Sequence, residues 1–194
     1  MVNRLFLILI LASVPGMLAY AAAPSTNVYE IEVVVFENRI PDLEGGELWA
    51  RAPDKSANTD MNDAVSVGEK PAADSTLSAT AAALESSGRH HVLAHLRWQQ
   101  SAEAKSVSKL VKVVSTDGAL DGALRFYLSR FLLLDVNLTL REAVSGGMSA
   151  GAGQIAPAYR LTEARRVKSS ETYYFDHPKF GALVRVSPAN KGKE

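Results

Sequence analysis

The stretch LDGALRFYLSRFLLLDVNLTL at residues 120–140 decides the fold. Its even-numbered positions are apolar except for Gly122 and Arg130, whereas most of its polar side chains, Arg125 among them, stand at odd-numbered positions. Residues two apart share one face of a strand, so alternation that keeps its phase over the whole stretch favours strands over a helix. The stretch predicts either one long bent strand or two strands joined near residues 129–130, with helical packing as the weaker alternative.

Strand patterns recur on both sides of this stretch. Residues 27–38 also alternate, and Ile31, Val33 and Val35 fall on a fully apolar face. Other segments rich in β-branched and aromatic residues predict strands at residues 89–100, 108–114, 159–167, 171–175 and 182–186. The expected total is about six strands.

A single helix is predicted after the first strand. Leu77 and Ala81 recur at a helical spacing, and Asp74 or Ser75 is expected to cap the N-terminus of the helix. Strands mostly follow strands directly, so the sheet should be largely antiparallel. The predicted fold is one two-layer α+β domain over residues 22–194, with a polar sheet face left for a partner.

The composition narrows the classes of function. The 194 residues include 21 Lys+Arg and 21 Asp+Glu, a balance that excludes the basic surplus of a dedicated nucleic-acid-binding protein. The chain has no cysteine, which excludes disulfides, thiolate metal sites and a cysteine nucleophile. Stretches rich in Gly, Ala, Ser and polar residues near 42–74 and 143–157 are predicted to be disordered loops.

Two motif matches in the second loop are interpreted as coincidental. A G-x-S-x-G match centres on Ser149, and Asp176 and His177 follow in hydrolase order. The chemistry needs a sharp strand-to-helix turn, which the flanking Gly and Ala residues do not predict. A G-x-G-x-x-A match at residues 151–156 is followed by Pro157 where a phosphate-binding helix should run.

Two side-chain pairs have the residue types of a metal or catalytic site. His91 and His95 would share a face of a helix, but on the predicted strand they lie ~13 Å apart, too far for one metal ion. Glu30 and Glu32 share a strand face ~7 Å apart, as in some glycosidases, but exposed strand carboxylates are far commoner. We therefore predict no catalytic residue, no metal site and no cofactor.

The N-terminus has the features of a signal peptide. Arg4 provides positive charge, residues 5–14 are apolar except for one serine, and small residues offer cleavage between Ala21 and Ala23. A membrane anchor is the alternative, but the apolar run falls short of the ~20 residues of a spanning helix. Residues 1–21 are thus predicted to be removed, leaving a soluble periplasmic protein without a membrane span.

The C-terminal third contains the candidate ligand-binding residues. Arg165 and Arg166 form a local basic cluster, suited to a carboxylate such as those of peptidoglycan stem peptides. Tyr173 and Tyr174 must face opposite ways on a strand, so one of them should be exposed. We group Tyr174 with the two arginines as a candidate ligand surface, whereas Trp98 is expected in the core.

A structural turn is predicted beside this cluster. It comprises Asp176, His177 and Pro178, with Gly181 at its exit. Asp caps such a turn, Pro stiffens it and Gly allows the chain to leave it.

Four segments together resemble the CsiV family of proteobacterial periplasmic peptidoglycan-binding proteins. They are VYEIEVVVFEN (28–38), HHVLAHLRWQQ (90–100), residues 120–140 and YRLTEARRVKSSETYYFDHPKFGALVRVSP (159–188). The last segment is the most specific, because it holds Arg165-Arg166, Ser170-Glu171, Asp176-His177-Pro178 and Phe180-Gly181. The resemblance implies a non-enzymatic protein that binds peptidoglycan and supports wall synthesis, together with a penicillin-binding synthase and its lipoprotein activator.

Two other functions remain open from the sequence. One is an envelope adaptor that binds only proteins and never glycan. The other, less favoured, is a small hydrolase. The predicted export and the sheet-rich domain favour a periplasmic binding and scaffold protein over both.

Overall fold

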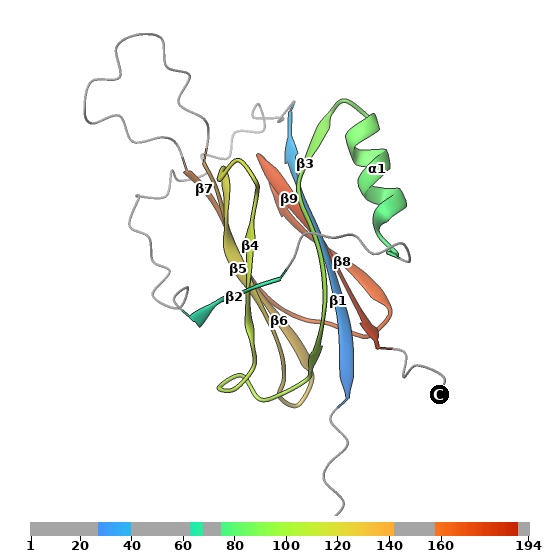
Figure 1. Cartoon of the computed structure of the whole chain (residues 1–194), viewed down its shortest axis with the longest axis vertical. Helices are drawn as coiled ribbons and strands as arrows, with labels where there is room; N and C mark the ends of the chain where they lie inside the picture. Colours follow the sequence, from blue (N-terminus) through green and yellow to red (C-terminus); the bar gives the residue numbers. More distant parts are fainter. Residues whose placement is uncertain (1–26, 40–62, 68–74, 142–157, 190–194) are drawn as a thin grey trace, which may run out of the picture.

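The computed structural model describes residues 27–39, 63–67, 75–141 and 158–189 (Figure 1). The described elements are β1 (Val28–Asn38), β2 (Val65–Ser66), α1 (Ser78–Ser86), β3 (His90–Ser101), β4 (Leu110–Val114), β5 (Leu120–Leu128), β6 (Leu132–Arg141), β7 (Ala158–Arg166), β8 (Glu171–His177) and β9 (Phe180–Pro188). The α+β class is confirmed, with nine strands among the described residues rather than about six. Residues 120–140 form two strands, and β2 lies inside the first stretch predicted to be a loop.

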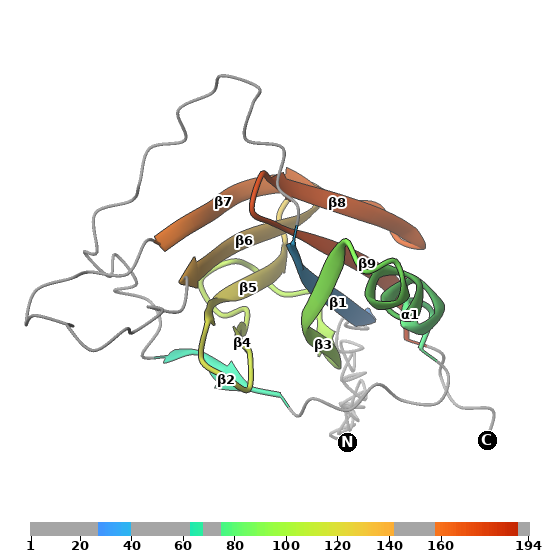
Figure 2. The ribbon, with the colours of Figure 1, turned by 90° about the horizontal axis from the view of Figure 1, so that it is seen from above.

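Two sheets build the domain (Figure 2). One has the strand order β3-β1-β9-β8 and the other β2-β4-β5-β6-β7. The paired strands are antiparallel except for the short β2–β4 pair. Side chains of both sheets meet in one core, and α1 lies on the outer side of the four-stranded sheet. The domain therefore has three layers where two were predicted.

The β5–β6 hairpin explains why the alternation never changes phase. Leu128 pairs with Leu132, so residues 129–131 form the turn, and even-numbered residues pair with even-numbered residues along both strands. Paired residues share a face, so the apolar positions of both strands point into the core. Gly122 interrupts the series because a β-carbon there would lie 2.3 Å from the backbone oxygen of Asn137.

Strand β1 is buried on both of its faces. Ile31 and Val33 face the core between the sheets, where both are fully buried. On the other face, Val34 packs against Leu77 and Ala81, from the N-terminal end of α1. Burying a side chain of this size contributes roughly 1.5–3 kcal/mol, so the helix is held mainly by this small apolar cluster.

Several predictions lie outside the described residues. They are the signal peptide at 1–21, the proposed cap Asp74, most of the two loops, Ser149 and the motif at 151–156. In the part of the chain that the structure describes, no helix is long and apolar enough to cross a membrane.

Candidate functional site

The three residues predicted as one ligand surface lie on three different faces of the domain. Arg165 stands opposite the core residue Leu134, and its neighbour Arg166 points to the other side of β7. Tyr174 stands opposite Leu183, which packs beneath α1. Successive strand residues point to opposite faces, so the two arginines cannot share a surface. The structure does not bring the three side chains together.

Arg165 lies between the two sheets. Its Nε donates a hydrogen bond to Oε1 of Glu163 at 2.7 Å, and its Nη1 donates to the backbone oxygen of Tyr174 at 2.9 Å. The guanidinium carbon also lies 4.7 Å from the ring centroid of Phe175. Because β7 and β8 are edge strands of different sheets, the contacts of Arg165 with Tyr174 and Phe175 join the sheets.

One tyrosine of the pair is exposed, as predicted, and it is Tyr174, at 44% exposure. Its ring stacks on Phe36 with centroids 6.2 Å apart, and its hydroxyl donates to Oδ1 of Asp176 at 2.6 Å. Burial and the Asp176 carboxylate raise the pKa of Tyr174, so the hydroxyl stays protonated. A β-carbon on Gly181 would lie 2.7 Å from the Tyr174 ring, so this glycine makes room for the stack.

The β8–β9 turn is tighter than the sequence predicts. Strand β8 ends at His177 and β9 begins at Phe180, which leaves Pro178 and Lys179 as the turn, and Asp176 is a paired strand residue. The backbone N–H of Lys179 donates to Nδ1 of His177 at 3.1 Å. Burial lowers the pKa of His177, which keeps the ring neutral and able to accept this bond.

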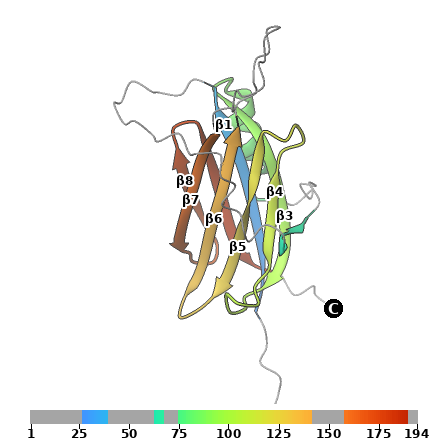
Figure 3. The same cartoon turned by 90° about the vertical axis from the view of Figure 1, so that its left-hand side faces the viewer.

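The outer surface of β4 to β7 is polar and partly exposed, and we call it the open face. It includes Arg125, Asp135, Asn137, Thr162 and Arg166, which alternate with core residues along their strands. Figure 3 shows these strands toward the viewer, with α1 behind them. No helix of the described residues covers the open face. It matches the polar sheet face expected from the sequence.

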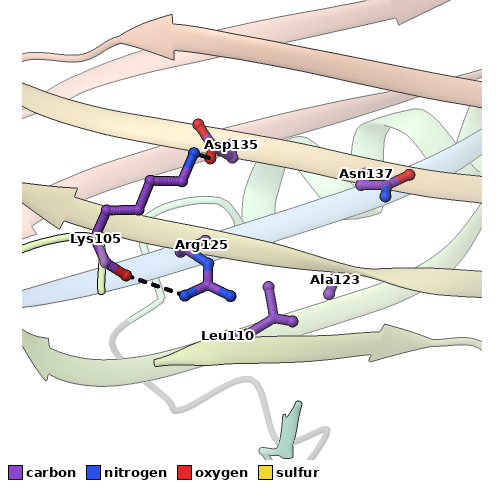
Figure 4. Close-up of a pocket in the computed structure, with 6 residues that line it drawn as sticks. All are labelled: Lys105, Leu110, Ala123, Arg125, Asp135 and Asn137. Carbon is purple, nitrogen blue, oxygen red and sulfur yellow. Dashed lines mark hydrogen bonds and ion pairs between the residues drawn. The ribbon is translucent and has the colours of Figure 1, made fainter. Parts of the chain in front are cut away.

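A pocket of about 320 Å³ lies on the open face (Figure 4). Its floor and rim come from the loop after β3 and from β4, β5 and β6. The lining residues are Lys105, Leu110, Ala123, Arg125, Asp135 and Asn137.

The pocket carries charges of both signs. Nζ of Lys105 forms an ion pair with Oδ2 of Asp135 at 2.6 Å, and the Tyr127 hydroxyl donates to Oδ1 at 3.1 Å. The hydrogen bond to Asp135 raises the pKa of Lys105. Nη1 of Arg125 donates to the backbone oxygens of Lys105 and Ser108, at 3.1 and 3.3 Å, which fixes the loop beside the pocket. This arrangement fits a polar ligand that itself carries both charge signs.

A buried carboxylate beneath α1 was not predicted. Glu32 is 3% exposed, and its Oε1 lies 2.7 Å from Nε2 of His95. The Ser75 hydroxyl donates to the same oxygen, and the backbone N–H groups of Thr76 and Leu77 donate to the carboxylate at 3.0 and 3.3 Å. Burial raises the pKa of Glu32, but the hydrogen bonds outweigh burial and hold this pKa below its usual value.

Ser75, one of the two predicted cap residues, does not cap α1: its hydroxyl donates to Glu32, which also accepts the N–H groups of Thr76 and Leu77 just before the helix. The residue before α1, Leu77, makes no side-chain capping bond. A carboxylate is favourable here because the N-terminus of a helix presents unpaired N–H groups and partial positive charge. The expectation that Glu32 is an exposed strand carboxylate is therefore wrong, because α1 covers that part of β1.

Ser75, His95 and Glu32 are a hydrolytic triad by residue type only. In a working triad the histidine stands between the serine and the acid and uses both ring nitrogens. Here the same Nε2 atom of His95 faces Glu32 at 2.7 Å and Ser75 at 3.4 Å. The serine hydroxyl is bound to the carboxylate directly, so the histidine does not relay its proton.

The members of the pairs His91/His95 and Glu30/Glu32 each contact a different partner. The strand placement of His91 and His95 is confirmed by β3, and Nδ1 of His91 contacts Glu85 at 3.1 Å. Glu30 pairs with Arg97 at 2.6 Å and lines a second polar hollow, below α1. No group of three or more His, Asp or Glu residues in the described ranges could hold a metal ion.

The chain is thus a two-sheet α+β domain with one helix-covered face and one open polar face. The family model described as peptidoglycan-binding protein, CsiV, matches residues 4–189, so the chain belongs to this family. The resemblance carried by the four sequence segments is confirmed. Comparisons with curated proteins and with solved structures find no match. The family description supports a binding role and implies a location in the cell envelope.

Sequence reasoning anticipated a polar face but not its key residues. The stretch that contains Lys105 predicts only a polar turn, and its ion-pair partner Asp135 is thirty positions away in the sequence. The odd-numbered polar residues of 120–140 were the available signal for the open face. The sequence does not indicate that Glu32 is buried, because the alternation of β1 does not show which face of the strand a helix will cover.

Proposed function

We propose that this protein binds peptidoglycan in the periplasm and acts without catalysing a reaction. The family match over residues 4–189 carries the proposal. The open face supports it, because peptidoglycan presents hydroxyls, amides and charges of both signs. The pocket offers matching groups in Arg125, Lys105, Asp135 and Asn137.

The contacts of two former hydrolase candidates support a non-enzymatic role. Asp176 accepts the hydroxyl of Tyr174, and buried His177 accepts the backbone N–H of Lys179. Both residues are committed to the β8–β9 hairpin. Their contacts are those of structural residues rather than partners of a nucleophile.

The proposal extends to wall assembly. The protein would hold peptidoglycan near a penicillin-binding synthase and the lipoprotein that activates it, as the family resemblance implies. A pull-down of envelope extracts with the tagged protein tests this step. Recovery of the synthase or its activator is expected, and recovery of neither would remove this part of the proposal.

Sedimentation with purified sacculi tests wall binding directly. The chain from residue 22 onward is incubated with sacculi at low salt and centrifuged, with serum albumin as a non-binding control. We expect the protein in the pellet and an unchanged pattern of soluble muropeptides. Protein found wholly in the supernatant would contradict wall binding, and released muropeptides would contradict the non-enzymatic role. Capture of the synthase without sacculus binding would favour a protein-only adaptor.

A further inference from the structure

Two arginines approach one exposed aromatic ring at the end of the open face. Phe131 lies in the β5–β6 turn, at the lower end of the sheet in Figure 3, and is 39% exposed. The guanidinium carbon of Arg166 lies 3.5 Å from the ring centroid, and that of Arg130 lies 5.5 Å from it. Stacking on a ring orients a guanidinium group and leaves its N–H edge available for hydrogen bonds.

No carboxylate of the described residues forms an ion pair with either arginine. Three carboxylates on neighbouring elements already have cations of their own, namely Asp135 with Lys105, Glu163 with Arg165 and Glu171 with Lys168. Two positive groups around one ring repel each other and create a local positive potential. An anionic ligand would relieve that repulsion.

The arginine pair and the pocket both lie beside β6. Arg166 stands opposite Leu133, which is two residues before Asp135 of the pocket. Two strand residues span ~7 Å, and both positions belong to the open face. A ligand bound at Phe131 would therefore reach the pocket within the length of a few amino acids.

We propose that Arg130 and Arg166, oriented by Phe131, bind a carboxylate of the peptidoglycan stem peptide. The rest of the peptide would lie along β6 toward the pocket. This inference rests on the proposed function and deepens it, because it assigns recognition to the peptide rather than to the glycan. It also gives Arg166 a role independent of Arg165 and Tyr174.

We call the surface from Phe131 along β6 to the pocket the peptide strip, and its chemistry favours a peptide over a polyanion. A guanidinium fork matches a carboxylate with two parallel hydrogen bonds. Asp135 lies close by on the same face, and a carboxylate there would oppose the repeated phosphates of a nucleic acid or an anionic lipid surface. A stem peptide containing diaminopimelate carries both carboxylates and an amine, which matches the mixed charges of the strip.

The test is an isothermal calorimetric titration of the chain from residue 22 onward with the stem tripeptide L-Ala-γ-D-Glu-meso-diaminopimelate. The affinity of the double variant Arg130→Gln/Arg166→Gln for the tripeptide is expected to fall by at least about tenfold, which corresponds to the loss of charge-assisted hydrogen bonds. Arg89→Gln, which removes an exposed arginine from the α1–β3 turn, is the matched control and should bind normally. Equal binding by the double variant would overturn the inference. A urea midpoint equal to that of the wild type would show that a loss of binding is not a loss of folding.

Sacculi stripped of their peptides by an amidase separate this inference from the proposed function. If the wild type binds intact sacculi but not the stripped glycan, both are supported. Equal binding to both materials would keep the proposed function and overturn the peptide site. Failure to bind intact sacculi would contradict the proposed function, whereas the tripeptide titration would still decide the arginine site.

Discussion

The two outer faces of this domain use charged side chains in opposite ways. On the helix-covered face, Glu32 is buried and accepts hydrogen bonds from Ser75, His95 and two backbone N–H groups. On the open face, charged groups form exposed lateral pairs, and among the described residues Arg166 stacks on the Phe131 ring without an ion pair. Both faces arise from strands with similar alternation. What differs is the layer above them.

This difference separates residues that stabilise the fold from residues available to a ligand. A buried charge is costly unless its bonding capacity is filled, so Glu32 ties β1, β3 and the start of α1 together. Exposed ion pairs contribute little to stability, because water competes for them. Substitutions on the covered face should therefore change folding, whereas those on the open face should change binding.

The largest effect is expected for Glu32→Gln. The variant keeps the side-chain volume but removes the charge that His95 and the N–H groups of Thr76 and Leu77 bind, and we expect a loss of about 2–3 kcal/mol in unfolding free energy. Glu30→Gln is the matched control on the same face of β1, where the partner Arg97 is partly exposed, and should cost less than about 1 kcal/mol. Urea denaturation measures both, and equal losses would contradict the distinction.

The next effect concerns the stack of Tyr174 on Phe36, on the outer face of the four-stranded sheet. In Gly181→Ala the new β-carbon would meet the rings of Tyr174 and Phe36 at 2.7 and 2.9 Å. We expect a loss of about 1–2 kcal/mol, because the exposed Tyr174 ring can move aside but then gives up its stack. The double variant Gly181→Ala/Tyr174→Ala should lose less from the added methyl group than the single variant does. If Gly181→Ala lowers the unfolding free energy equally with Tyr174 and with Ala at position 174, the contact with the Tyr174 ring does not cause the loss.

The covered face should also give folding a distinct dependence on pH. The pKa of Glu32 is held below its ordinary value of 4.5, so its contribution is complete above the unfolded-state pKa and is lost as pH falls through the folded-state pKa. Unfolding free energies measured between about pH 6 and pH 3 should fall more steeply for the wild type than for Glu32→Gln. Parallel curves would indicate that other carboxylates dominate acid unfolding.

The sequence predicted the strands well because they depend on local periodicity. The β5–β6 hairpin follows from the alternation at 120–140, and Trp98 is buried as its phase implied. The number of sheets could not be predicted, because periodicity shows which face of a strand is apolar but not which strand lies opposite it. For the same reason, the packing of the predicted helix over Glu32 could not be predicted.

The candidate site was less predictable, since it depends on residues brought together by strand pairing. Adjacent Arg165 and Arg166 look like one basic cluster in the sequence, but strand geometry sends them to opposite faces. From the sequence, Arg130 marks only the point near residues 129–130 where two strands join, and nothing singles out Phe131. Their proximity to Arg166 follows from the β6–β7 register, which a single sequence does not contain.

The smallest effect on folding is expected for Lys105→Gln on the open face. Its side chain is 59% exposed, so breaking its ion pair with Asp135 should change the unfolding free energy by no more than about 0.5 kcal/mol. Removing this cation leaves the Asp135 carboxylate unpaired beside the proposed peptide strip, so retention on sacculi should weaken and should depend less on salt. Sedimentation at low and high salt, alongside urea denaturation, measures both properties on one variant. A loss of stability as large as that of Glu32→Gln would show that the open face also supports the fold, and that the two faces do not divide these tasks.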